Sequence, residues 1–78
     1  MIALGKYMQV GDDPAESPSG KTKVWSIFDR NGGLLGTVSW FGRWRCYAFN
    51  PCECTTYNGG CMDELASFCK RVTQEHRK

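Results

Sequence analysis

The chain has 78 residues, of which 41% are hydrophobic and 23% are charged, and its net charge is +2. This length allows one domain with a small core, and the hydrophobic content excludes a wholly disordered chain. No apolar run reaches the ~18 residues of a transmembrane helix, so we expect no membrane partner. The first residues lack the pattern of a signal peptide. We therefore expect a cytoplasmic protein whose five cysteines stay reduced.

Residues 1–20 are expected to form an N-terminal arm or linker that is partly flexible. Ile2, Leu4, Tyr7 and Val10 suggest a short strand, but their alternation is irregular. Residues 11–20 place two prolines and two glycines among polar residues, which is typical of a linker. A single β-β-β-α domain is then expected over residues 21–78.

Residues 23–49 predict a three-stranded antiparallel meander, with strands at 23–29, 34–41 and 44–49. The segment 31–33, Asn-Gly-Gly, supplies the positive φ that a tight hairpin needs, and Gly42 with Arg43 predicts a two-residue second turn. Pro51 should end the third strand because it has no backbone N–H. A fourth, short edge strand at 55–57 is an alternative.

The last segment predicts a helix with one apolar stripe. Asn58 is a candidate N-cap, and Asp63 and Glu64 are expected in the first turn, where they favour the helix dipole. The fold class is therefore α+β, a three- or four-stranded antiparallel meander packed on one C-terminal α-helix. The stripe has the helical period and consists of Cys61, Leu65, Phe68, Cys69 and Val72.

The two turns predict which side chains share a face of the sheet. One face is expected to be exposed and polar at its centre, with Phe41 opposite Trp44 near the second turn. The other face should pack on the helix as the core. Its members are large and apolar: Trp25, Ile27, Val38, Trp40, Tyr47 and Phe49.

The end of the sheet near the second turn is the candidate contact surface, because aromatic residues and arginine dominate binding hot spots. Residues 21–49 also carry five cationic side chains and one carboxylate, so their net charge of +4 favours an acidic partner. The plainer alternatives are a solvated rim and an aromatic pair that only stabilises the hairpin. The candidate partner-binding residues are Phe41, Arg43, Trp44, Arg45, Lys21 and Lys23.

The chemistry-bearing residues form no catalytic motif. Cys52 and Cys54 are separated by one residue, whereas zinc knuckles usually separate their cysteines by two to four. Whether Cys52, Cys54 and Cys61 bind zinc stays open. His76 is the only histidine and lies in a charged tail. We expect no enzyme activity, no catalytic residue and no cofactor.

A pattern of fold-bearing residues extends over residues 23–73. It comprises Trp25, Leu35, Gly36, Trp40, Trp44, Arg45, Tyr47, Phe49, Leu65 and Phe68. In this pattern the chain resembles small, uncharacterised proteins of bacteriophages and prophages. The resemblance implies a mobile-element origin, where compact proteins such as anti-CRISPR proteins block host machinery by occlusion.

Three functional hypotheses follow. The first is a mobile-element protein that binds a host protein or ribonucleoprotein complex and inhibits a defence nuclease of the CRISPR type. The second is a nucleic-acid-binding module that uses the basic sheet. The third is a homodimer joined through the small polar sheet face, rather than a monomer.

Overall fold

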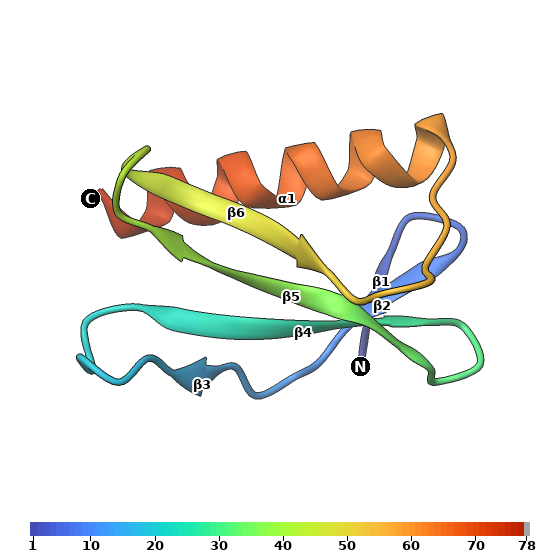
Figure 1. Ribbon diagram of the computed structural model, residues 1–78, viewed down its shortest axis with the longest axis horizontal. Coiled ribbons are helices and arrows are strands. Elements are labelled where there is room, and N and C mark those ends of the chain that lie inside the picture. The colour runs from blue at the N-terminus through green and yellow to red at the C-terminus, as the bar shows by residue number, and fades with distance from the viewer. Residues whose placement is uncertain (78) are drawn as a thin grey trace.

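The computed structural model describes residues 1–77 and shows an antiparallel sheet with one long helix packed along it (Figure 1). The helix is α1, Gly59–His76. The strands are β1 Ile2–Leu4, β2 Met8–Val10, β3 Ala15–Glu16, β4 Lys23–Asp29, β5 Leu34–Phe41 and β6 Cys46–Pro51.

The main sheet has the strand order β1-β2-β4-β5-β6, and every pairing is antiparallel. The two-residue strand β3 pairs separately with the first residues of β4. This architecture confirms the α+β class with one C-terminal helix. The predicted number of strands, three or four, was too low.

The missed strands lie in the first 16 residues, which were expected to form an arm. Gly5 turns the chain with φ of 69°, so that β1 and β2 form a hairpin, and β2 pairs with β4 through Val10 and Ile27. Leu4, Met8 and Val10 are all buried in the core. Strands of three residues are too short to show a period, which is why the sequence pattern did not reveal them.

The structure confirms the bounds of the first two predicted strands and the composition of the two faces. Trp25 pairs with Val38, one of the two registers that a tight turn within residues 31–33 allows, but a register shift after Ile27 pairs Phe28 with Leu34. Residues 30–33 therefore form a loop between β4 and β5 rather than the predicted tight turn. Ile27 and Val38 are fully buried against the helix stripe. Trp25 packs between Tyr47 and Phe68, with ring centroids 5.2 and 5.6 Å away.

The second hairpin differs from the prediction in its loop. Phe41 pairs with Cys46, so residues 42–45 form a four-residue loop rather than a two-residue turn. Arg45 adopts a left-handed backbone with φ of 53°, a conformation that no sequence signal indicates for arginine. The register therefore shifts by two residues, and an even shift leaves each side chain on its predicted face.

Asn58 caps the N-terminus of α1, and its side-chain oxygen accepts a 2.9 Å hydrogen bond from the N–H of Cys61. This confirms the predicted N-cap. No acidic residue lies in the first turn, because the helix starts at Gly59, four residues before Asp63. The predicted dipole role of Asp63 and Glu64 in that turn was therefore wrong.

Strand β6 covers Cys46–Pro51 instead of the predicted residues 44–49, and Pro51 is its last residue. The alternative strand at 55–57 is absent from the described structure. The N–H of Cys52 still donates to the carbonyl of Leu35 across the strand pair at 2.8 Å. The nitrogen of Pro51 consequently faces the outer edge, where no ladder donor is needed. Residues 52–58 instead form a loop in which the hydroxyl of Tyr57 donates to the carbonyl of Leu35.

Candidate interaction surface

The loop between β5 and β6 is a tight, hydrogen-bonded turn. The N–H of Trp44 donates to the carbonyl of Phe41 at 3.1 Å, and the N–H of Arg45 donates to the carbonyl of Gly42 at 3.3 Å. These two bonds close the loop on itself. The side chains of Arg43 and Trp44 therefore project from a defined backbone.

Phe41 and Trp44 form an exposed aromatic pair at this end of the sheet. Their ring centroids lie 4.7 Å apart in an edge-to-face arrangement. Trp44 is 69% exposed and Phe41 is 39% exposed. The cross-strand pairing of these residues was wrong, since Trp44 lies in the loop, but their predicted contact is present. A single pair of this kind stabilises a hairpin by only ~0.2–1 kcal/mol. This small contribution does not by itself account for the exposure of two large aromatic side chains.

The loop rests on the end of α1. The guanidinium of Arg77 donates a 2.8 Å hydrogen bond to the carbonyl of Arg45. At the base of the loop, the rings of Trp40 and His76 lie 4.5 Å apart. Neither contact follows from a pattern in the sequence, because both depend on where the helix end meets the hairpin. Together they connect the hairpin that carries the aromatic pair to the C-terminal end of α1.

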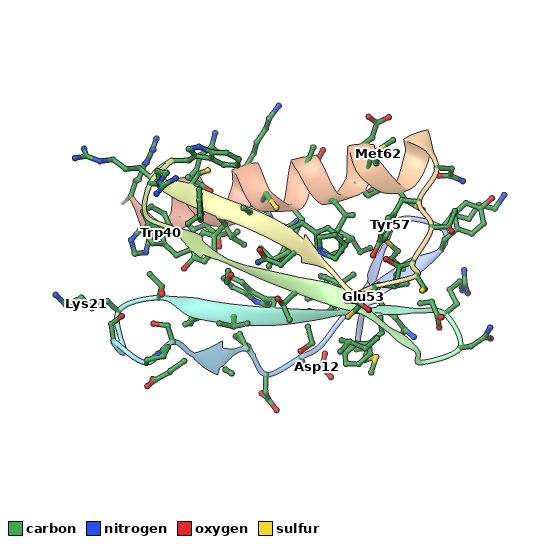
Figure 2. All side chains as sticks on the ribbon, viewed as in Figure 1. Asp12, Lys21, Trp40, Glu53, Tyr57 and Met62 are labelled. Carbon is green, nitrogen blue, oxygen red and sulfur yellow. The ribbon has the colours of Figure 1, made fainter. Side chains whose placement is uncertain are left out.

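The two predicted lysines lie at the same end of the molecule but near the other face of the sheet. Figure 2 shows Lys21 and Trp40 at one end, away from Glu53 and Met62. The backbone N–H of Lys23 donates to the hydroxyl of Tyr47, whose ring is in the core. The structure thus brings Phe41, Arg43, Trp44 and Arg45 together, and places Lys21 and Lys23 on the helix side.

The sheet face opposite α1 has an uncharged centre. None of the side chains that β4, β5 and β6 direct to this face is ionisable as a cation or a carboxylate, and Phe41 stands at its end. Depletion of charge is the usual composition of the centre of a protein interface. The residues are Val24, Ser26, Phe28, Leu34, Thr37, Ser39, Phe41, Cys46, Ala48 and Asn50.

The five cysteines are free thiols. Cys61 is buried and Cys54 is exposed. Burial raises the pKa of Cys69, and the nearby thiol of Cys46 raises it further. Within residues 1–77, no three His, Cys, Asp or Glu side chains converge as a group that could hold a metal ion.

Two further findings concern the chain as a whole. No helix formed by residues 1–77 combines the length and the apolar character needed to cross a bilayer. A comparison with protein families, curated proteins and solved structures finds no match to the chain.

Proposed function

We propose that this protein acts by binding another protein through the Phe41–Trp44 pair and the uncharged sheet face beside it. The observation that carries the proposal is the 69% exposure of Trp44 on a loop that hydrogen bonds hold in place. A rigid, exposed tryptophan buries a large area on binding at little cost in side-chain entropy. Arg43 and Arg45 flank it and would pair with carboxylates at the rim of the partner.

The distribution of charge favours a protein over a nucleic acid for this surface. A nucleic acid laid on the sheet would bring phosphates onto a face whose centre offers no cation, whereas phosphate contacts supply most of the affinity for DNA. Lys21 and Lys23 border a hollow on the helix side of the sheet, away from the uncharged face. Binding of single-stranded nucleic acid, with a base stacked on Trp44, remains the second candidate function, favoured by the cations gathered at this end.

The biological role we propose is inhibition by occlusion. A folded contact surface is sufficient to cover a functional site of a host protein or ribonucleoprotein complex, and it needs no active site. Given the resemblance to phage and prophage proteins, we propose a defence nuclease complex of the CRISPR type in the host cytoplasm as the target.

The test is capture from a lysate of the host, before and after digestion with nuclease. We expect wild-type protein to retain a partner after digestion and the Trp44→Ala variant to lose it. Met62→Ala is the matched control, since Met62 is an exposed apolar residue on α1 at the far end of the molecule. Loss of every partner on digestion would instead support the nucleic-acid candidate.

A homodimer through the uncharged sheet face is distinguished by mass in solution. Light scattering over a hundredfold range of protein concentration should give the mass of one chain if the face is reserved for a different partner. A stable mass of two chains that Ser39→Arg reduces to one would replace the proposal with self-association.

A further inference from the structure

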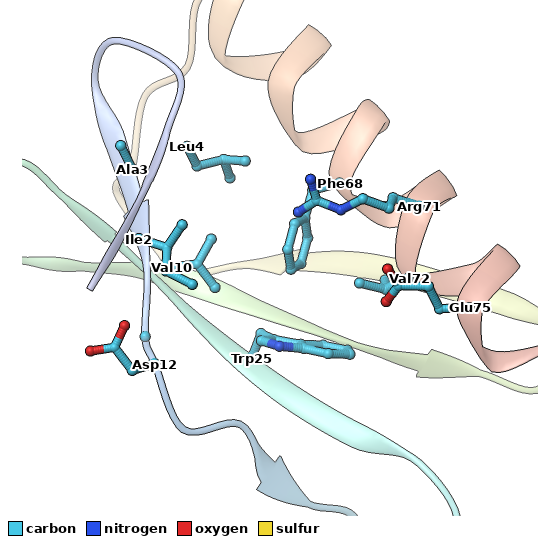
Figure 3. A pocket seen from close by; sticks show the side chains of 11 residues that line it. Ile2, Ala3, Leu4, Val10, Asp12, Trp25, Phe68, Arg71, Val72 and Glu75 are labelled. Carbon is cyan, nitrogen blue, oxygen red and sulfur yellow. The ribbon is translucent and has the colours of Figure 1, made fainter.

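A groove runs along the side of the molecule opposite the uncharged sheet face, between α1 and the N-terminal strands. Its first hollow, drawn in Figure 3, encloses about 370 Å³ and has Trp25 at its floor. A second hollow of about 240 Å³ continues from it toward the start of β4. The two hollows share Trp25, Val72 and Glu75 as lining residues, so they form one continuous groove.

The groove lies over the helix side of the sheet at its β1 end. Ile2, Val10 and Trp25 border the first hollow. The pairings of Ile2 with Val10 and of Val10 with Ile27 place these three side chains on one face of the sheet. Helix α1 forms the opposite wall through Phe68, Arg71 and Val72. The groove therefore has a sheet floor and a helix wall along which an extended segment can lie.

The lining of the groove changes from apolar to basic along its length. At the β1 end, Ile2 is 62% exposed, and Figure 3 shows Phe68 directed down toward the ring of Trp25. At the other end, the second hollow is bordered by Lys21 and Lys23. An occupant that matches both ends needs an apolar side chain at one end and a negative charge at the other.

The charged groups on the rim leave an excess of positive charge. Arg71 stands over the ring of Phe68 at 5.2 Å and adds a third cation to the two lysines. The carboxylates are Glu75 and Asp12, and Asp12 already accepts a 2.8 Å hydrogen bond from the amino group of Met1. The groove therefore favours an acidic occupant.

We infer that this groove binds an extended segment of a partner protein that carries an apolar anchor residue and, three or four residues away, a carboxylate. The anchor packs over Trp25 beside Ile2, and the carboxylate pairs with Lys21 and Lys23. The spacing follows from the chain between Lys21 and Trp25: Lys23 is two residues and Lys21 four residues from Trp25. A carboxylate between the two lysines therefore lies about three residues from the anchor, at ~3.3 Å per residue. The groove is open along its length, which suits a peptide better than a small ligand enclosed on most sides.

The inference concerns a surface separate from the loop of Trp44 and does not rest on the proposed function. Its probe is a set of eight-residue synthetic peptides labelled with fluorescein. Each peptide carries one Leu, Ile, Phe or Trp anchor with Glu three or four residues to either side, and a matched peptide carries Lys in place of Glu. Binding to the full chain is measured by fluorescence anisotropy.

At least one Glu peptide is expected to bind about tenfold more tightly than its Lys counterpart, which corresponds to ~1.4 kcal/mol. The double variant Lys21→Glu, Lys23→Glu should reverse this preference, a gain of binding that loss of folding cannot produce. The matched control Arg43→Glu, Arg45→Glu makes the same change of charge on the loop and should leave peptide binding unchanged. Trp44→Ala should also leave it unchanged, so that this test and the test of the proposed function fail separately.

Three results would overturn the inference. The first is that no peptide of the set binds. The second is that Glu and Lys peptides bind equally to the wild-type chain. The third is that a labelled oligothymidine binds and displaces the peptides, which would assign the groove to nucleic acid.

Discussion

The backbone N–H of Tyr47 donates a 2.9 Å hydrogen bond to the hydroxyl of Thr73, which is buried on α1. The same hydroxyl donates to the carbonyl of Cys69 at 2.7 Å. One side chain thereby satisfies a backbone donor on the outer edge of β6 and fixes the helix against that edge. This contact prevents another strand from pairing with the outer edge of β6, which is the sheet edge nearest the candidate loop.

Thr73→Val should destabilise the protein by about 1–3 kcal/mol, because it leaves the N–H of Tyr47 buried without an acceptor. Thr73→Ser retains the hydroxyl and is the matched control, with a smaller loss. Urea unfolding followed by circular dichroism measures both. Equal stability of the valine variant and the wild type would show that water replaces the hydroxyl.

Gly36→Ala should destabilise the protein by about 1–3 kcal/mol, since the added methyl has no room. A Cβ at this position would meet the carbonyl oxygen of Asn50 and would come within 2.8 Å of the ring of Phe49. Gly42→Ala is the matched control, because the nearest atom to its Cβ, Nε1 of Trp40, is 3.9 Å away. A similar midpoint for the two variants in urea would contradict this packing.

The left-handed backbone of Arg45 gives a third prediction. Replacement by glycine, which adopts positive φ without steric cost, should leave stability unchanged or raise it by up to about 1 kcal/mol. Arg45→Val should lower it, since β-branched residues are disfavoured there. If the valine variant unfolds at the same urea concentration as the glycine variant, the loop does not hold this conformation.

The thiols should differ in reactivity toward iodoacetamide. Cys54 is exposed and should be alkylated first, whereas burial raises the pKa of Cys69 above its ordinary value of 9.0 and lowers its thiolate fraction at any given pH. The unfolded thiol ionises at lower pH than the folded one, so this group should also reduce stability as the pH rises above about 9. Peptide mapping by mass spectrometry at pH 7 and 9 gives the order, and faster labelling of Cys69 than of Cys54 would contradict it.

Much of the central hairpin could be predicted from the sequence because turn residues and alternation agree there. The turn residues 31–33 and the alternation around Ile27 and Val38 predict β4, β5 and their faces. The length of the loop at 30–33 and the register shift after Ile27 were not predicted. The strands β1 and β2 could not be predicted, since each has three residues and gains its stability from tertiary burial of Leu4 and Met8. The length of the 42–45 loop depends on the backbone of one arginine, which its residue type does not indicate.

The residues of the candidate site could be predicted from the sequence, but the contacts that position them could not. The strand pattern predicted that Phe41 and Trp44 are exposed beside arginines. The rings of Phe41 and Trp44 are in contact in the structure. The contact of Arg77 with the loop and the groove over Trp25 involve elements far apart in sequence. Such relationships depend on the angle at which α1 crosses the sheet, and local sequence carries no record of it.

The affinity of the Trp44→Ala variant for the captured partner is the most direct test of the proposed binding surface. Truncation of a hot-spot tryptophan costs about 2 kcal/mol or more, roughly a thirtyfold increase in Kd. Calorimetric titration should show this increase for Trp44→Ala and an unchanged Kd for Met62→Ala, at equal melting temperatures. An unchanged Kd for Trp44→Ala with a lowered melting temperature would contradict the account and leave the aromatic pair as a stabiliser of the hairpin.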